Sequence, residues 1–235
     1  MQGKLYLIPN HLGDTQTGMT IPRDVAKTAS DLKYYIVENL RTARRFLKLL
    51  DKEKDIDGST FFLMDKHTDA EEYIHFFHPL EEGHDVGIIS EAGCPGVADP
   101  GAEIVKIAHR RNIAVVPLTG PSSILLALMA SGLNGQNFAF NGYLPIDKNE
   151  RSKTIKQLES KSIKDNQTQI FIETPYRNAS LVREIIKHCQ PFTLLCIACD
   201  VTLPEEFIKT MPASEWQGNL PELHKRPTVF LLQGI

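Results

Sequence analysis

The chain reads Ser90-Glu91-Ala92-Gly93-Cys94-Pro95-Gly96-Val97-Ala98-Asp99-Pro100-Gly101 directly after the apolar run 86–89 and directly before a helical pattern at 102–109. This loop holds three glycines and two prolines. Glycine lets the main chain approach a ligand closely and adopt positive φ, and proline fixes the path of the chain. Because ligands of open α/β sheets sit beyond the carboxyl ends of strands, the loop is predicted to hold a ligand against its backbone. A plain connection is the alternative, although a tight turn needs fewer such residues.

Apolar runs typical of strands alternate with helical patterns along the whole chain, which predicts an α/β fold. In the first half, strands are expected at 5–8, 34–37, 60–63, 86–89 and 114–116, and helices at 41–50, 69–77 and 102–110. Such alternation indicates a mostly parallel sheet covered by helices. After a helix at 122–131 the pattern changes, with strands expected at 137–140, 169–173, 193–199 and 228–233, a further candidate strand at 201–210, and helices at 150–160 and 181–188.

A break at Pro117-Leu118-Thr119-Gly120-Pro121 divides the chain. We place a domain boundary near residue 118, which gives an N-terminal α/β domain at 1–118 and a C-terminal α/β domain at 119–235. The loop after Ile89 and the helix start at Gly120-Pro121-Ser122-Ser123 can then face one cleft between the domains, where ligand sites are common. Proline and serine are good helix starters by themselves, so this helix start also has a purely structural explanation.

The composition is that of an ordinary globular protein, with 42% hydrophobic and 23% charged residues among 235 and a net charge of −3. No apolar run approaches the ~20 residues of a membrane span, and the first residues lack the pattern of a signal peptide. A cytoplasmic protein without membrane contact is therefore expected. The net charge gives no global attraction to nucleic acid, so any such binding must rest on a local basic patch.

One basic patch is predicted on the helix at 41–50, which we call the basic ridge: Arg41, Arg44, Arg45 and Lys48 recur at helical spacing opposite an apolar stripe. Most such ridges are solvated faces, but if the substrate is a nucleic acid, its phosphates bind here. A second polar segment, Glu173-Thr174-Pro175-Tyr176-Arg177, follows the strand at 169–172. Its carboxylate either closes a turn by an ion pair or orients a ligand.

Metal, redox and standard nucleotide sites are not indicated by the sequence. Cys196 and Cys199 have C-x-x-C spacing, but residues i and i+3 of a strand face opposite sides, so their sulfurs cannot converge. His75 and His78 lack a second ligand pair, and no metal is expected. The chain has neither a G-x-G-x-x-G fingerprint after its first strand nor a P-loop. Cys94 is a conceivable nucleophile, but no partner base can be named for it.

Five motifs, taken in order, resemble those of the tetrapyrrole (corrin/porphyrin) methylase superfamily, and within it they are most similar to the ribosomal RNA small-subunit methyltransferase I family. The family sequences P-T-P-I-G-N-L, S-D-A-G-T-P…D-P-G, P-L-P-G-P, F-x-G-F-L-P and F-x-E-S-x-x-R correspond here to 9–15, 90–101, 117–121, 140–145 and 171–177. Each motif alone is weak, but the ordered set spans nearly the whole chain and is specific.

The resemblance implies two α/β domains with S-adenosylmethionine bound in the cleft between them, usually in a homodimer. Methyl transfer from its sulfonium is an in-line displacement, so the site mainly needs positioning and a desolvated path. The implied donor contacts are Pro9, Gly93, Cys94, Pro95, Val97, Ala98, Ser122, Ser123, Ile172, Thr174, Ala198 and Cys199.

The implied reaction is methylation of RNA, at the ribose 2′-hydroxyl of a cytidine in small-subunit rRNA. A carboxylate or histidine near that hydroxyl helps to remove its proton, and Glu38, His67 and Glu173 are the candidates. The candidate contacts to the RNA are Arg41, Arg44 and Arg177.

The chain departs from the family on the loops assigned to the acceptor. The family's A-E-D-T-R stands here as Val37-Glu38-Asn39-Leu40-Arg41, its N-E-H as Asp65-Lys66-His67, and the aspartate of S-D-A-G as Glu91. These departures leave two alternatives open. One is a methyltransferase that acts on a tetrapyrrole or another small molecule, and the other is a non-catalytic protein that binds S-adenosylmethionine.

Overall fold

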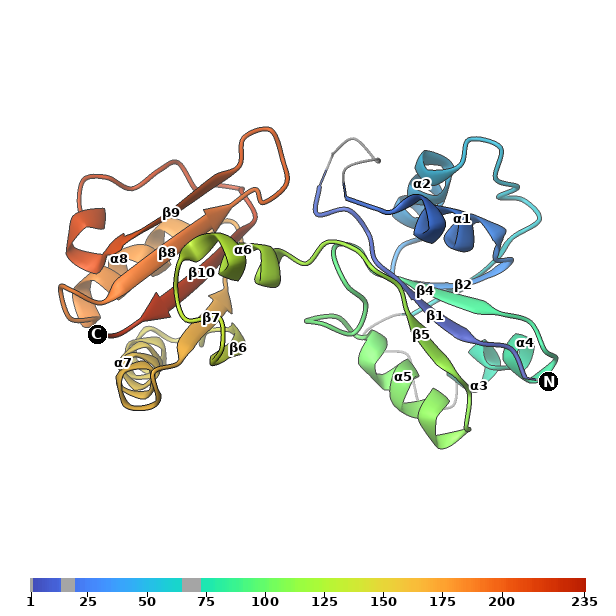
Figure 1. Cartoon of the computed structure of the whole chain (residues 1–235), viewed down its shortest axis with the longest axis horizontal. Coiled ribbons are helices and arrows are strands. Elements are labelled where there is room, and N and C mark those ends of the chain that lie inside the picture. Colours follow the sequence, from blue (N-terminus) through green and yellow to red (C-terminus); the bar gives the residue numbers. More distant parts are fainter. Residues whose placement is uncertain (1, 14–19, 65–72) are drawn as a thin grey trace. The chain divides into compact units, whose positions relative to one another are not determined.

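The computed structural model describes residues 2–13, 20–64 and 73–235. The chain divides into two units, Met1–Ser122 and Ser123–Ile235, each with a five-stranded sheet and helices, which confirms the predicted α/β class (Figure 1). The domain boundary is expected near residue 118, and the two units divide between Ser122 and Ser123. None of the helices in the described ranges is long and apolar enough to cross a membrane.

Unit 1 is built on five parallel strands in the order β3-β2-β4-β1-β5. Their bounds are Leu5–Ile8 (β1), Tyr34–Val37 (β2), Thr60–Leu63 (β3), Val86–Ile89 (β4) and Val115–Pro117 (β5). The first four match the predicted ranges, and the fifth begins one residue later than predicted. Because all five run in one direction, the loops that follow them leave from the same edge of the sheet.

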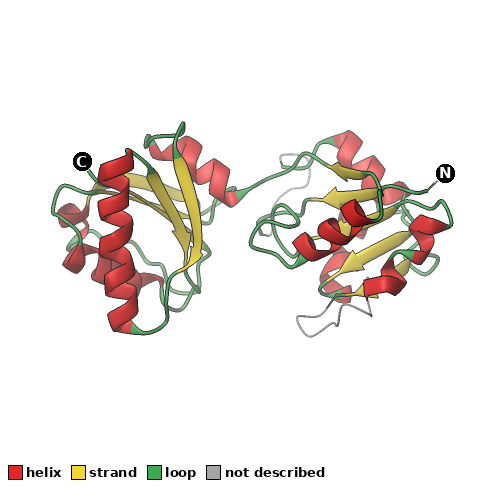
Figure 2. Cartoon of the chain, turned by 90° about the horizontal axis from the view of Figure 1, so that it is seen from below, coloured by secondary structure: helices red, strands yellow, loops and turns green. Residues whose placement is uncertain are grey.

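Helices cover both faces of this sheet, as Figure 2 shows. Their bounds are Arg23–Asp31 (α1), Leu40–Leu50 (α2), Tyr73–Phe76 (α3), His78–Glu81 (α4) and Gly101–Arg110 (α5). α1 and α2 pack on the core around Tyr35 and Ile89, whereas α3, α4 and α5 pack on the core around Ile36 and Ile88. Residues 69–72 of the helix expected at 69–77 lie outside the described ranges.

Unit 2 has a mixed sheet in the order β6-β7-β10-β8-β9. Its strands are Phe138–Tyr143 (β6), Thr168–Ile172 (β7), Leu194–Cys199 (β8), Phe207–Pro212 (β9) and Thr228–Gln233 (β10). Only β6 and β7 pair in parallel, and the other three pairs are antiparallel, so the parallel arrangement indicated for the first half does not extend to the second. β8 and β9 are joined by a short loop, which an antiparallel pair allows and a parallel pair does not.

The helices of unit 2 are Ser123–Ser131 (α6), Lys148–Asp165 (α7) and Asn178–His188 (α8), with a 3₁₀ turn at Ala213–Trp216 (η2). α7, α8 and η2 cover one face of the sheet, where their apolar side chains surround Phe171 and Phe230. α6 packs on β8, β9 and β10. α7 is longer than the helix expected at 150–160 because Asp147 caps its first turn and Asn166, at φ 46°, ends it.

A buried ion pair fastens α7 to α8. The Arg151 guanidinium donates to both carboxylate oxygens of Glu184, at 2.9 and 2.6 Å, and also to the carbonyls of Pro145 and Ile146. The side chains of Arg151 and Glu184 are only 6% and 16% exposed. The hydrogen bonds from Arg151 hold the pKa of the Glu184 carboxyl below its usual value. This pair therefore also fixes the segment that follows β6.

Arg151→Met should destabilise unit 2 by about 3–5 kcal/mol at neutral pH, because the buried Glu184 carboxylate loses its partner. The folded-state pKa of the Glu184 carboxyl lies below its usual value, so the contribution of the pair is fully present above the usual pKa and is lost as the pH falls through the folded pKa. The deficit of the variant should therefore shrink in acid. Urea unfolding followed by Trp216 fluorescence reports on unit 2 alone, since this buried residue is the single tryptophan of the chain.

The matched control is Lys156→Met, at an exposed position of the same helix α7 in unit 2. This change should cost at most about 1 kcal/mol. Equal, small losses in both variants would show that the Arg151–Glu184 pair is not a structural fastening.

Candidate active site

Four loops that follow strands of unit 1 begin within the described ranges at the carboxyl edge of the parallel sheet. They begin at Pro9 after β1, at Glu38 after β2, at Ser90 after β4 and at Leu118 after β5. Residues 65–72, including the predicted His67, lie outside the described ranges. The sequence therefore brings most of the predicted unit 1 residues to one edge.

The loops after β1 and β4 are joined backbone to backbone. The amide of Asn10 donates to the carbonyl of Gly93 at 2.9 Å, and the amide of Gly93 donates to the carbonyl of Asn10 at 3.1 Å. The Asn10 Nδ2 group donates to the carbonyls of Ser90 and Glu91, at 2.9 and 3.3 Å. β1 leads toward β2 and β4 leads toward β5, on opposite sides of this pair. The joined loops therefore mark the topological switch point, where open α/β sheets bind ligands.

Two glycines let a third loop, the one after β5, pack against this pair. Gly93 has φ +70°, and a Cβ there would lie 3.3 Å from Leu12. A Cβ on Gly120 would lie 2.2 and 2.5 Å from the ring atoms of Pro9, closer than real atoms approach. The Cys94 thiol donates to the carbonyl of Pro121 at 3.5 Å. The three loops thus form a surface of main chain and small side chains, as the glycine and proline content predicts.

The rest of the long loop is fixed by Asp99. One of its carboxylate oxygens accepts from the amides of Gly96, at 3.2 Å, and Gly101, at 2.7 Å. Gly96 and Ala98 both have positive φ, at 78° and 57°, and the Val97 side chain is 48% exposed. The bonds to Asp99 hold this left-handed backbone in place ahead of α5.

Two titratable side chains beside the switch point are kept neutral. Burial raises the pKa of the Cys94 thiol, so it is not activated as a thiolate. Burial also lowers the pKa of His11, which stands where the family has a proline, and its Nδ1 lies 2.6 Å from the Thr20 hydroxyl. A neutral, backbone-rich surface of this kind can accept a cationic ligand without repelling it.

The basic ridge lies on α2, close to the long loop. Asn39 caps this helix by accepting from the amides of Arg41, at 2.9 Å, and Thr42, at 3.3 Å. The Thr42 hydroxyl donates to Glu91 at 2.5 Å, which ties the loop after β4 to the first turn of α2. Arg44 lies over the ring of Phe61 at 5.4 Å. The ridge, comprising Arg41, Arg44, Arg45 and Lys48, is exposed along its length.

In unit 2, two of the predicted donor contacts lie on one rung of the sheet. Ile172 of β7 and Ala198 of β8 both pair with Val229 of the intervening β10. Cross-strand partners point to the same face, so these three side chains share it. The side chain of Cys199 instead belongs to the core under α7 and α8, which leaves only its backbone for any ligand contact. Cys196 is not in that core, in line with the opposite orientation predicted from spacing.

Glu173 and Arg177 form an ion pair, which is one of the two roles that the sequence leaves open for the Glu173 carboxylate. Arg177 donates from Nε and Nη2 to Glu173 Oε1, at 3.0 and 2.6 Å, and the amide of Thr174 donates to the same oxygen at 2.6 Å. Glu173 is 4% exposed, and its Oε2 accepts no hydrogen bond from the described residues. The carboxylate therefore closes the turn with one oxygen and keeps the other unpartnered.

Ser122 and Ser123 are half-buried where α6 begins, at the division between the units. Asn10 joins the loops after β1 and β4 through its backbone and its side chain, yet the sequence assigned it no role. A polar amide directly after a buried strand was the signal that could have identified it. Within the described residues, no group of three or more His, Cys, Asp or Glu side chains could hold a metal ion.

Comparison with known proteins identifies the family of the chain. The model of the tetrapyrrole (corrin/porphyrin) methylase family matches residues 23–217. The chain is 30% identical to ribosomal RNA small subunit methyltransferase I of Leptospira borgpetersenii serovar Hardjo-bovis, over 96% of this chain and 83% of that protein. It is 26% identical to the protein of the same name from Escherichia coli O157:H7, over 99% and 78%.

Among solved structures, uroporphyrin-III C-methyltransferase from Thermus thermophilus, in complex with S-adenosylhomocysteine, matches 98% of this chain and 97% of its own. The TM-score is 0.57 and the identity 15%, a likeness of fold. The family model covers most of the sequence, and the relatives match it nearly end to end. The chain belongs to the tetrapyrrole (corrin/porphyrin) methylase family and is a methyltransferase.

Proposed function

We propose that this methyltransferase modifies RNA, at the ribose 2′-hydroxyl of a cytidine in small-subunit rRNA. The relatives named for small-subunit rRNA methylation support the acceptor class. The observation that carries the proposal within this chain is the exposed basic ridge, tied by Thr42 and Glu91 to the loop at the switch point. Methylation of rRNA also makes a cytoplasmic location part of the proposal.

S-adenosylmethionine is the methyl donor, as the family and the solved neighbour with bound S-adenosylhomocysteine support. When bound, it supplies an electrophilic methyl group on a cationic sulfur. The switch-point surface fits such a group because its glycines open the backbone and its nearby thiol and imidazole are neutral. The proposed contacts in unit 1 are Pro9, Gly93, Cys94, Pro95, Val97, Ala98 and Ser122. Those in unit 2 are Ser123, Ile172, Thr174 and Ala198, with Cys199 through its backbone.

On the acceptor side, we assign proton removal to Glu38, which is half-buried directly after β2 and beside the cap of α2. Glu173 is assigned a positioning role, since one of its oxygens already holds Arg177 and Thr174. His67 remains a candidate from its motif. Phosphates of the RNA are assigned to Arg41 and Arg44, with Arg177 as a further contact.

A homodimer is part of the proposal. In unit 2 the large apolar side chains of Met129, Tyr143 and Ile146 are 79%, 60% and 75% exposed. Exposed apolar side chains that gather on a surface mark protein–protein contacts. A second copy of the chain would cover such side chains.

Gly120→Ala should weaken binding of S-adenosylhomocysteine by about 10- to 100-fold, because the new Cβ forces the loop after β5 away from Pro9. Calorimetric titration of the whole protein measures the affinity. The control is Gly135→Ala, since a Cβ at Gly135 has no atom within 4 Å and neither glycine has positive φ. The assignment fails if both variants bind like the parent.

Methyl transfer should be seen with tritiated S-adenosylmethionine and small ribosomal subunits that lack the modification, with the label on a ribose. Glu38→Gln should lower the rate by about 10²- to 10⁴-fold at unchanged S-adenosylhomocysteine affinity, as expected for loss of a general base. Glu103→Gln, on the exposed face of α5, is the matched control. Labelling of uroporphyrinogen III and not of RNA would replace the proposal with the small-molecule alternative.

The basic ridge should set the salt dependence of RNA binding. Arg41→Gln combined with Arg44→Gln should reduce the slope of log affinity against log salt concentration by about 1 to 2, because two phosphate contacts are lost. Filter binding over a range of salt concentrations measures the slope. Lys27→Gln with Lys106→Gln removes two exposed helix charges elsewhere in unit 1 and should leave it unchanged. Equal slopes for all three proteins would contradict the role of the ridge.

A further inference from the structure

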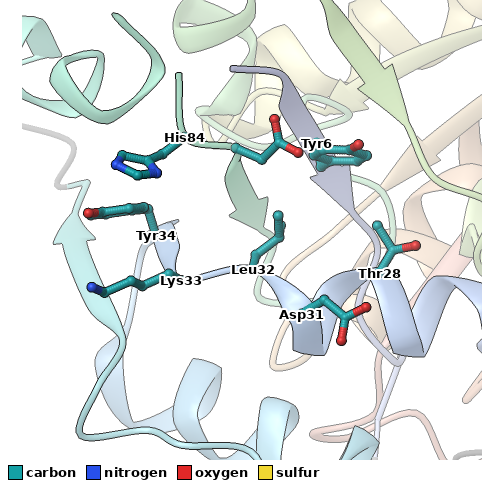
Figure 3. Close-up of a pocket in the computed structure, with 8 residues that line it drawn as sticks. Tyr6, Thr28, Asp31, Leu32, Lys33, Tyr34 and His84 are labelled. Atoms are coloured by element: carbon teal, nitrogen blue, oxygen red, sulfur yellow. The ribbon is translucent and has the colours of Figure 1, made fainter. Parts of the chain in front are cut away.

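A hollow of about 360 Å³ opens in unit 1 near the amino ends of β2 and β4 (Figure 3). It is lined by residues from β1, from the last turns of α1 and from the segments that lead into β2 and β4. Because the five strands are parallel, this edge of the sheet is opposite the edge that carries the switch-point loops. The hollow is therefore separate from the proposed methyl-transfer site.

Aromatic side chains lie on two sides of this hollow. The rings of Tyr34 and His84 are 5.3 Å apart with an interplanar angle of 36°, and Lys33 Nζ lies 5.8 Å from the Tyr34 ring centre. Figure 3 shows Tyr34 between the side chains of His84 and Lys33, with Tyr6 across the hollow and Leu32 between them. Leu32 is buried and gives the hollow an apolar floor. A flat aromatic ring is the group that such walls accommodate.

Polar groups complete the lining. Asp85 accepts from the amide of Lys4 through Oδ1, at 2.7 Å, and its Oδ2 has no partner among the described residues. Asp31 pairs with Lys27 through Oδ2, at 2.7 Å, and its Oδ1 likewise has no partner among the described residues. The Lys33 ammonium makes no ion pair within the described parts of the chain. The hollow therefore offers two acceptors for O–H or N–H groups and one cation.

We propose that this hollow binds a nucleoside 5′-monophosphate unit, either free or as one nucleotide of an RNA chain. The base lies among the aromatic side chains, the sugar hydroxyls or an exocyclic amine donate to the free carboxylate oxygens, and the phosphate meets Lys33. The single lysine disfavours a di- or triphosphate, whose additional charge has no partner in this lining. The RNA source rests on the proposed function, whereas the free nucleotide does not.

The test is calorimetric titration of the whole protein with CMP in the presence of saturating S-adenosylhomocysteine, which occupies the donor site. One CMP per chain should bind. His84→Ala should weaken this binding about tenfold, as loss of a stacking partner does. Lys33→Gln should weaken binding of CMP much more than binding of cytidine, because it removes the phosphate contact, which cytidine does not make. Both residues are exposed, so these variants keep the core, and Lys106→Gln is the matched control.

A competition experiment between CMP and RNA decides whether the bound nucleotide is free or part of an RNA chain. If CMP displaces a single-stranded RNA from the parent but not from His84→Ala, the nucleotide belongs to RNA. If RNA binding is indifferent to CMP, the site takes the free nucleotide. No CMP binding at about 10 mM, or equal binding by parent and both variants, would overturn the inference. Because methyl transfer and S-adenosylhomocysteine binding are measured separately, a failure here leaves the proposed function untouched.

Discussion

The parallel pairing of β1 with β4 is the constraint on which the rest of unit 1 depends. It places the ends of Ile8 and Ile89 side by side, so that Asn10 and Gly93 exchange two backbone hydrogen bonds just beyond the sheet. Backbone groups that close this edge must find partners, and here they find each other across the two loops. The loop after β5 can then pack on Pro9 only through Gly120. The surface beyond the strands is consequently made of main chain.

This construction explains how one edge can combine a rigid backbone with little charge. Asn10 donates to the carbonyls of Ser90 and Glu91, and Asp99 accepts from the amides of Gly96 and Gly101, so the loop after β4 is fixed near both of its ends. The positively charged groups of the basic ridge lie on α2. Under the proposed function the site benefits from this separation, since the cationic donor and the polyanionic RNA each meet their own part of the surface.

The sequence was sufficient for most strands and insufficient for features that depend on tertiary contacts. The runs at 5–8, 34–37 and 86–89 are buried on both faces of the sheet, so their continuous apolar sequence is enough to predict strands. α1 went unpredicted because it buries only Val25 and Ala29 and lacks a side-chain cap. The antiparallel pairing in unit 2 and the orientation of Cys199 depend on which strands become neighbours, which local pattern does not encode. Likewise, only the structure shows that one carboxylate oxygen of Glu173 accepts from Arg177.

Two departures from the family motifs, at Asn39 and Glu91, lie at the N-terminus of α2, where the helix dipole is positive. Asn39 replaces an acidic residue but caps the helix, since its amide oxygen accepts from the amides of Arg41 and Thr42. A negative charge is retained at Glu91, where the family has an aspartate, and its carboxylate accepts from Thr42 in the first turn of α2. Anionic groups stabilise helix N-termini wherever they originate in the chain. Both departures therefore remain compatible with a capped α2, and the Thr42–Glu91 bond makes the switch-point loop and the basic ridge parts of a single connected structure.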